Sequence, residues 1–300
     1  MTIEATAALL EQVFPGTRLS RPDYLVWLYE RNPFGTVVAT NLDDEQGRAG
    51  HYAVTPLELS ARGVPRAAGL SLNTAVHERA RGGGVFTRLA EQTFDAARAR
   101  GLEVVIGVAN ANSTPGFLRR LQFELVGPLP ATVLLPTPGR DRLRSGWADA
   151  AAFAPGGLAA SSEHLLQPAS TGIEPRWSAE TLRWRLAAPG SRYALHRGDD
   201  VLVVSTVDRR KRVPVAVLLA IFAAAPLDDA AARAVVRAAC RFHRAPLALH
   251  VGINANVAFR GLPLPERLRE SPLNLIYRDL TGVARTDEVR RLEFVDFDAY

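Results

Sequence analysis

The sequence has few of the residues that anchor a fold covalently or fix it in a membrane. Its 300 residues include one cysteine, Cys240, which excludes an internal disulfide, a secreted disulfide scaffold and a thiolate zinc cluster. The longest apolar run, residues 213–227, contains two prolines and is shorter than the roughly 20 residues of a membrane-spanning helix. No basic run precedes an apolar segment at the N-terminus, so no secretory signal is expected. We therefore expect a cytoplasmic protein that does not enter a membrane, and no metal site.

Lysine is almost missing as well. The 36 basic residues include one lysine, Lys211, and the net charge is +5. The tightest basic cluster, residues 209–212, lies between two apolar β-like runs, so we interpret it as a solvated hairpin tip. A surplus of arginine favours anionic ligands but says nothing about the fold. Nucleic acid is not an expected partner, and the oligomeric state cannot be read from the sequence.

Hydrophobic residues make up 47% of the chain, and its length is typical of two domains. In the first half, an amphipathic helix over 23–29 precedes β-branched runs that predict an antiparallel meander. The second half repeats the order of a meander, a helix and a strand. Between the halves, Pro, Gly, Ala and Ser predominate. We predict a mixed α+β fold with a first domain at 1–135, a linker at 136–167 and a related, degenerate domain at 168–300.

A run of three glycines lies at the end of the first meander. Gly82, Gly83 and Gly84 follow the strand predicted over 66–76 and precede a helix predicted over 85–100, which leads into a continuous apolar strand. Such a strand is typical of one covered on both faces, and it predicts a parallel βαβ unit. Glycine lets backbone N–H groups approach an anion closely at the positive end of a helix. The loop therefore predicts a diphosphate site, although a flexible connection is the alternative.

The loop pattern of Arg79, Gly82 and Gly84, with Asn110-Ala111-Asn112-Ser113 after the next strand, resembles the acetyl-CoA site of the GNAT N-acetyltransferase superfamily. The resemblance covers roughly residues 20–130 and extends to a two-domain bacterial group that includes nucleotide-sugar N-acyltransferases. It implies a GNAT-like fold for the first domain and acetyl-CoA or another acyl-CoA as cofactor. The residues that it assigns to the cofactor are Thr74, Val76, Arg81, Gly82, Gly83, Gly84, Val85, Phe86, Asn110, Asn112, Ser113 and Phe117.

The implied activity is transfer of an acetyl or other short acyl group to a primary amine, such as an amino sugar linked to a nucleotide. Direct attack on the thioester needs a route for the amine proton and stabilisation of a tetrahedral oxyanion. His51 and Asn73, on adjacent strands, are the candidate catalytic residues. Phe117 stands where many superfamily members place a tyrosine acid, a role that a phenyl ring cannot fill. Two alternatives remain open, a non-catalytic CoA-binding or regulatory module and an aminoacyl transferase of the peptidoglycan type.

Overall fold

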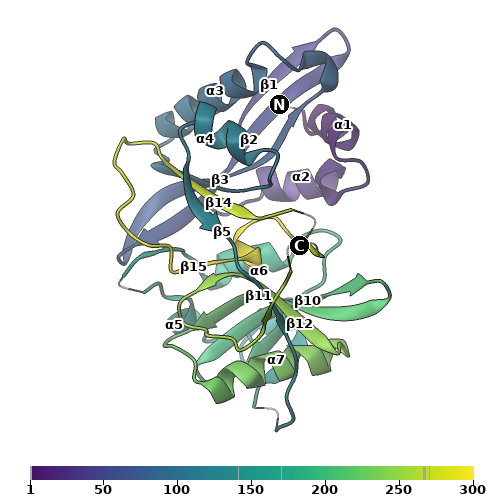
Figure 1. The fold of residues 1–300 in the computed structure, drawn as a ribbon, viewed down its shortest axis with the longest axis vertical. Helices are drawn as coiled ribbons and strands as arrows, with labels where there is room; N and C mark the ends of the chain where they lie inside the picture. The colour runs from purple at the N-terminus through teal and green to yellow at the C-terminus, as the bar shows by residue number, and fades with distance from the viewer. Residues whose placement is uncertain (1, 141, 170, 266–267, 270) are drawn as a thin grey trace. The chain divides into compact units, whose positions relative to one another are not determined.

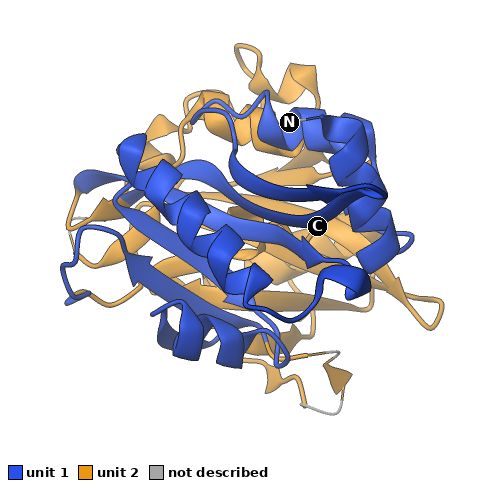
Figure 2. Cartoon of the chain, turned by 90° about the horizontal axis from the view of Figure 1, so that it is seen from above, with its two compact units in different colours: residues 1–59, 64–128, 273–286 blue, residues 60–63, 129–272, 287–300 orange. Residues whose placement is uncertain are grey.

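The computed structural model describes residues 2–140, 142–169, 171–265, 268–269 and 271–300. The chain divides into two compact units, each with its own sheet (Figures 1 and 2). Unit 1 comprises residues 1–59, 64–128 and 273–286, and unit 2 comprises residues 60–63, 129–272 and 287–300. Helices and strands alternate in both, which confirms the predicted mixed α/β class. None of the helices described here combines the length and the apolar character that crossing a bilayer requires.

Unit 1 is built on a mixed sheet with the strand order β1-β2-β3-β4-β14-β5. Strands β3 and β4 are parallel, whereas β1 with β2, β4 with β14 and β14 with β5 are antiparallel. The predicted βαβ unit is therefore confirmed as β3, α3 and β4. The elements of this unit are α1 (Ile3–Val13), α2 (Pro22–Tyr29), β1 (Val38–Asp44), β2 (Gly47–Ala61), β3 (Val64–Val76), α3 (Val85–Ala99), β4 (Val104–Ala109), α4 (Thr114–Arg120), β5 (Glu124–Pro128) and β14 (Asn274–Asp279), with short 3₁₀ turns at η1 (Arg18–Ser20) and η2 (Glu78–Ala80).

Helix α3 forms where the sequence predicts it, because its apolar residues recur on one face. Ala90, Phe94 and Ala97 are spaced by four and three residues and are fully buried. Phe94 meets Tyr52 of β2 edge-on, with ring centroids 5.5 Å apart, and both belong to the core of unit 1. This packing holds the middle of α3 against β2.

Strand β14 joins unit 1 from near the end of the chain. Ile276 lies opposite Gly107 of β4 on one side and Leu125 of β5 on the other. Two residues on, Arg278 is buried and donates to the Glu91 carboxylate of α3 at 3.0 Å and to the Leu121 carbonyl at 2.7 Å. The contiguous domain boundaries at 135 and 167 stay a prediction. The compact units divide the chain differently, because β14 pairs with strands far earlier in the sequence.

Unit 2 has a second mixed sheet, in the order β13-β6-β12-β11-β10-β9-β7, with β15 paired to β12. The residues predicted as a linker include β7, η3 and α5 and belong to this unit. The elements of unit 2 are β6 (Ala131–Leu134), β7 (Arg144–Trp147), η3 (Ala150–Phe153), α5 (Glu163–Leu166), β8 (Ile173–Pro175), α6 (Ala179–Leu186), β9 (Ala194–Arg197), β10 (Val201–Arg210), β11 (Val213–Ala223), α7 (Asp229–His243), β12 (Leu247–Asn254), β13 (Leu262–Pro263), β15 (Arg291–Glu293) and η5 (Phe294–Asp296).

The order of elements in unit 2 repeats that of unit 1, as the sequence predicts. Strands β9, β10 and β11 form an antiparallel meander, α7 follows, and β12 returns parallel to β11. The basic residues 209–212 form the tip of the β10–β11 hairpin, as expected. Cys240 of α7 is buried in the core of this unit, and burial raises the pKa of its thiol to about 11. That environment suits a packing residue rather than a nucleophile.

Candidate active site

The parallel strands β3 and β4 pair over only part of their length and then separate. Their register runs from Ala68 opposite Val104 to Ser71 opposite Gly107. Two residues beyond Ser71, Asn73 has a left-handed backbone with φ of +51°, which interrupts the regular ladder. Asparagine tolerates this conformation better than most residues. Beyond this point a pocket of about 730 Å³ opens between the carboxyl ends of the two strands.

The glycine loop lies at the start of α3 and presents its backbone outward. Gly82, Gly83 and Gly84 are exposed and all have positive φ, at +96°, +54° and +72°. A Cβ added at any of them would meet nothing within 4 Å, so the backbone conformation, and not crowding by the chain, requires glycine. Within the described residues, their N–H groups donate to no other group of the protein. The amides and the positive end of α3 therefore leave room for an anion.

Ion pairs and backbone hydrogen bonds hold the loop in place. Arg79, the first residue of the loop pattern, donates to the Asp44 carboxylate at 2.8 Å and to the Arg48 carbonyl at 3.3 Å. The N–H of His77 donates to the Ala49 carbonyl at 2.8 Å. Arg79 therefore anchors the loop to β1 and β2, whereas Arg81 is exposed and lines the pocket.

The opposite wall of the pocket is a turn that closes on itself. The N–H of Ser113 donates to Oδ1 of Asn110 at 2.9 Å, and the hydroxyl of Thr114 donates to the Asn110 carbonyl at 2.7 Å. Below this turn, Phe117 packs edge-on against Phe86 and Phe123, with centroids 5.6 and 5.2 Å away. This part of the pocket is apolar.

The pocket brings together most of the residues that the sequence assigns to a cofactor. The remaining four residues lie at the start of α3 and do not line the pocket; they are Gly82, Gly83, Gly84 and Val85. Their assigned contacts, like those of the lining residues, stay predictions. The lining residues from that set are Thr74, Val76, Arg81, Phe86, Asn110, Asn112, Ser113 and Phe117, and Asn73 lines the pocket with them.

A chain of four polar side chains leads from the pocket into the interior of unit 1. Asn73 donates from Nδ2 to the Tyr29 hydroxyl at 2.9 Å. That hydroxyl lies 3.0 Å from Nε2 of His51, and Nδ1 of His51 lies 2.7 Å from Oδ1 of Asn41. His51 is fully buried, and this burial, reinforced by the charge of Arg48, lowers its pKa to about 3. The imidazole is therefore neutral at physiological pH.

The catalytic role predicted for His51 stays a prediction, and the structure shows what surrounds it. Both ring nitrogens are used by Tyr29 and Asn41, and the ring has no exposed surface. Tyr29 and Asn41 were not recognised from the sequence. Asn41 lies directly opposite His51 in the pairing of β1 and β2. The register of these two strands therefore predicts Asn41 as a partner of His51. Tyr29 ends the amphipathic helix α2, where its spacing alone predicts a core residue.

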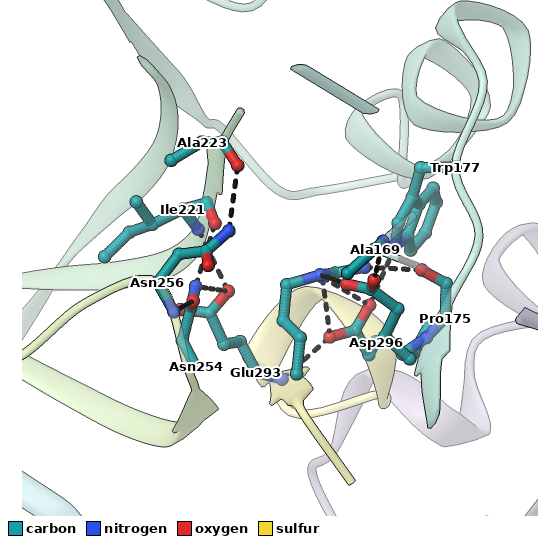
Figure 3. Close-up of polar contacts among 11 residues, drawn as sticks. Ala169, Pro175, Trp177, Ile221, Ala223, Asn254, Asn256, Glu293 and Asp296 are labelled. Atoms are coloured by element: carbon teal, nitrogen blue, oxygen red, sulfur yellow. Dashed lines mark hydrogen bonds and ion pairs between the residues drawn. The ribbon is translucent and has the colours of Figure 1, made fainter. Parts of the chain in front are cut away.

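At the corresponding place unit 2 has a smaller pocket, of about 170 Å³, and side chains of the unit bond to the strand edge that borders it. Strands β11 and β12 pair from Val215 opposite Leu247 to Leu218 opposite His250 and are not paired beyond that point. There, the Ile221 N–H donates to the Glu293 carboxylate at 3.0 Å, and the Ile221 carbonyl accepts from Nδ2 of Asn254 at 2.8 Å (Figure 3). Both backbone groups of the strand edge are therefore already satisfied.

Glu293 is held firmly at this strand edge. It is fully buried, and its Oε1 lies 2.8 Å from Nε2 of His250. Its Oε2, which accepts from the Ile221 N–H, also accepts from Nδ2 of Asn254 at 3.1 Å. Its own N–H donates to Asp296 at 2.7 Å, and Asp296 is paired with the buried Arg291 (Figure 3). Each of these buried polar groups has a partner within the protein, so the Ile221 edge of this smaller pocket has its backbone groups satisfied without a ligand.

One family model matches part of the chain, and solved structures share its fold. Residues 2–126 match the family model described as an acetyltransferase (GNAT) domain. Comparison with curated proteins gives no match. Three solved structures resemble most of the chain. A GCN5-related N-acetyltransferase from Anabaena variabilis is 13% identical, with a TM-score of 0.67 over 93% of this chain and 70% of that one. A probable N-acyltransferase from Enterococcus faecalis is 11% identical, with a TM-score of 0.64 over 93% of this chain and 70% of that one. The Saccharomyces cerevisiae N-myristoyltransferase with bound myristoyl-CoA is 11% identical, with a TM-score of 0.57 over 92% and 79%. At these identities the likeness concerns the fold.

Proposed function

We propose that this chain, whose residues 2–126 match the model of a GNAT acetyltransferase domain, transfers an acyl group from acyl-CoA to a primary amine. One observation carries the proposal. In unit 1 a pocket of about 730 Å³ opens between β3 and β4 beside a loop of exposed glycine amides, whereas the corresponding pocket of unit 2 measures about 170 Å³ and its strand edge is already bonded to Glu293 and Asn254. Unit 1 is therefore the half that takes the cofactor.

The residues of the pocket suit an acyl-CoA. The amides of residues 82–84 would receive its diphosphate, and the free edge of β3 at Thr74 and Val76 would hold the pantetheine arm as an added strand. The Thr74 hydroxyl is buried and has no hydrogen-bond partner within the described residues, which is uncommon for a buried polar group. When bound, acyl-CoA supplies an acyl group already activated as a thioester.

The protein contributes orientation and stabilisation of charge. A backbone N–H near Val76 would receive the oxyanion that forms when an amine attacks the thioester carbonyl. The Asn73 side chain would orient that amine. Phe117 cannot donate a proton, but a thiol with a pKa of about 8.5 is an acceptable leaving group without an acid. No covalent intermediate on the protein is required.

Within this class of reaction, we propose an amino sugar linked to a nucleotide as the acceptor, as the sequence resemblance implies. Arg81 and Arg120 line the pocket, and their charges would suit the phosphates of a nucleotide. The apolar surroundings of Phe117 favour a second candidate, a module that binds CoA without turnover, because no acid is present at that position.

Titration calorimetry with acetyl-CoA, followed by a thiol-release assay over a panel of primary amines, tests the proposal. We expect binding, and release of CoA that depends on the amine. Binding without release for every amine would favour the non-catalytic module, and absence of binding would refute the cofactor site.

Tyr29→Phe separates binding from turnover. It removes the hydroxyl that holds Asn73 in place, so Nδ2 of Asn73 and Nε2 of His51 lose their partner. A buried polar group without a partner costs about 1–3 kcal/mol of free energy. We expect kcat to fall by about tenfold or more while the Kd for acetyl-CoA is unchanged. The matched control is Tyr24→Phe, which removes another buried tyrosine hydroxyl from α2 outside this chain of contacts. Equal losses of kcat in both variants would contradict a specific role for Tyr29.

A further inference from the structure

Asn73 presents a single free polar atom to the pocket. Its Nδ2 is used by Tyr29, and its Oδ1 makes no hydrogen bond to any described residue. Asn73 lines the pocket, and its Oδ1 is not enclosed by the protein. The pocket therefore meets an amide oxygen at this point, which can accept a hydrogen bond and cannot take up a proton.

The orientation of Asn73 is set by the chain of contacts behind it. Oδ1 of Asn41 can only accept, so Nδ1 of His51 carries the proton and Nε2 is an acceptor. The Tyr29 hydroxyl must then donate to Nε2, and its oxygen accepts from Nδ2 of Asn73. If the amide were reversed, Oδ1 would face a hydroxyl oxygen whose proton is already used. Each contact in the series therefore keeps the oxygen of Asn73 turned toward the pocket.

The charged groups around this oxygen do not supply a base. On the described wall of the pocket the charged side chains are Arg81 and Arg120. Arg48 lies behind His51, where its charge lowers the pKa of the imidazole. On α1, Glu11 is exposed and accepts from the Gly16 N–H at 3.1 Å.

The other tyrosine near the pocket, on β2, does not supply a base either. The Tyr52 hydroxyl is bonded to Ser71 at 2.7 Å, and burial raises the pKa of this tyrosine.

We propose that the acceptor is a weakly basic amine that binds in its uncharged form, with one N–H donated to Oδ1 of Asn73. This inference rests on the acyltransferase function proposed above and names its substrate class as amines beside an electron-withdrawing carbon, such as α-amino groups and amino sugars. An α-amino group has a pKa near 7.8 and a lysine-type amine one near 10.4, so at pH 7 the neutral fractions differ by about 300-fold. Alkylamines and polyamines are therefore poor acceptors.

The pH dependence of kcat/KM with two amines of different basicity tests this inference on the unmodified enzyme. Alaninamide and glucosamine serve as weakly basic amines, and n-propylamine as the alkylamine, with acetyl-CoA as donor. We expect kcat/KM for n-propylamine to rise about tenfold per pH unit between pH 6 and 9, and the profile of alaninamide to level off near its own pKa. An inflection at one pH shared by both amines would reveal an enzymatic base and overturn the inference alone.

Asn73→Asp provides a second measurement, because aspartate also tolerates the positive φ and places a carboxylate at the same point. We expect the ratio of kcat/KM for n-propylamine to that for alaninamide to rise by at least tenfold at pH 7. The matched control, Leu273→Asp, adds the same charge elsewhere on the pocket wall, at a residue with no assigned cofactor contact, and should leave this ratio within about twofold.

An unchanged ratio in Asn73→Asp, in protein that still binds acetyl-CoA, would overturn the inference. Absence of transfer to every amine would instead refute the acyltransferase function, and this inference with it.

Discussion

Replacing Gly84 by glutamate places a carboxylate at the proposed diphosphate site. Gly84 precedes α3 and is exposed, and a Cβ added to it would have no atom within 4 Å, so a longer side chain fits without displacing its neighbours. The positive φ of +72° adds a conformational cost of about 1–2 kcal/mol, which Gly84→Gln shares. The comparison of these two variants therefore isolates the charge.

The size of the charge effect follows from Coulomb's law. Two phosphate charges about 5 Å from the new carboxylate each contribute about 0.8 kcal/mol in a water-like dielectric, or about 1.6 kcal/mol together. The Kd for acetyl-CoA in Gly84→Glu should thus exceed that in Gly84→Gln by about 15-fold or more. Since the screening length falls from about 10 Å at 0.1 M salt to about 3 Å at 1 M, most of this difference should disappear at high salt.

Gly101 offers a matched control at the other end of α3. It has a similar positive φ, of +82°, and the same open surroundings. Titration calorimetry of Gly101→Glu should therefore give a Kd for acetyl-CoA close to that of the unmodified protein. Equal Kd values for the glutamate and glutamine variants at position 84, or an equal loss in Gly101→Glu, would refute the placement of the diphosphate.

Other outcomes depend on buried groups of the two units. The pKa of His51 falls from 6.5 to about 3 on folding, so its stabilising effect is complete above pH 6.5 and is lost as the pH falls toward 3. In urea unfolding, the free energy of unfolding of the unmodified protein should fall by about 2 kcal/mol between pH 7 and pH 5. His51→Gln should not show this fall, and an equal fall in both proteins would contradict the reasoning. Glu91→Gln removes the charge partner of the buried Arg278 and should lower the free energy of unfolding by about 1–3 kcal/mol. The loss is smaller than for a fully buried pair because Glu91 is partly exposed. An unchanged urea midpoint would contradict this prediction. Acetyl-CoA should bind with a calorimetric stoichiometry of one per chain, because the pocket of unit 2 is small and Glu293 occupies its strand edge, and a value of two would show that this pocket also takes the cofactor.

Local features of unit 1 could be predicted from the sequence because their causes are local. The helix predicted over 85–100 is α3, Val85–Ala99, since apolar spacing alone decides which face is buried. The triple glycine marks a turn with positive φ at each position, and this too depends on neighbouring residues only. The continuous apolar strand predicted after this helix is β4, Val104–Ala109, because a run of apolar residues is also a local signal.

The position of β14 could not be predicted, because nothing local specifies its partners. Residues 274–279 are apolar enough for a strand, but their place between β4 and β5 is set by contacts across a large sequence separation. Arg278 is part of that specification, since its guanidinium reaches Glu91 and the Leu121 carbonyl only in this register. Pairing of this kind depends on the assembled sheet and not on the composition of the strand.

The sequence predicts which segments line the pocket but not the side-chain contacts behind them. Residues on β3 and in the turn after β4 were assigned by motif, and the structure places them on one pocket. The link from Asn73 through Tyr29 to His51 was missed, because it joins a helix to two strands through side chains. Whether His51 faces the pocket or the interior depends on a strand register that alternation alone does not fix.

The helices that connect the two strands of each parallel pair differ at their first residues, and this bears on which pocket can take an anion. Both α3 and α7 follow the last strand of a meander, but α7 begins with Asp228, whose carboxylate accepts from the Ala231 N–H at 2.7 Å. An aspartate there satisfies an N–H of the first turn and would repel a phosphate. Helix α3 begins with Gly84, which has no side chain to bond to an N–H of the first turn or to repel a phosphate. In unit 1, an external anion can therefore take the place that Asp228 takes in unit 2. Likewise, a cofactor arm can occupy the strand edge that Glu293 and Asn254 complete in unit 2.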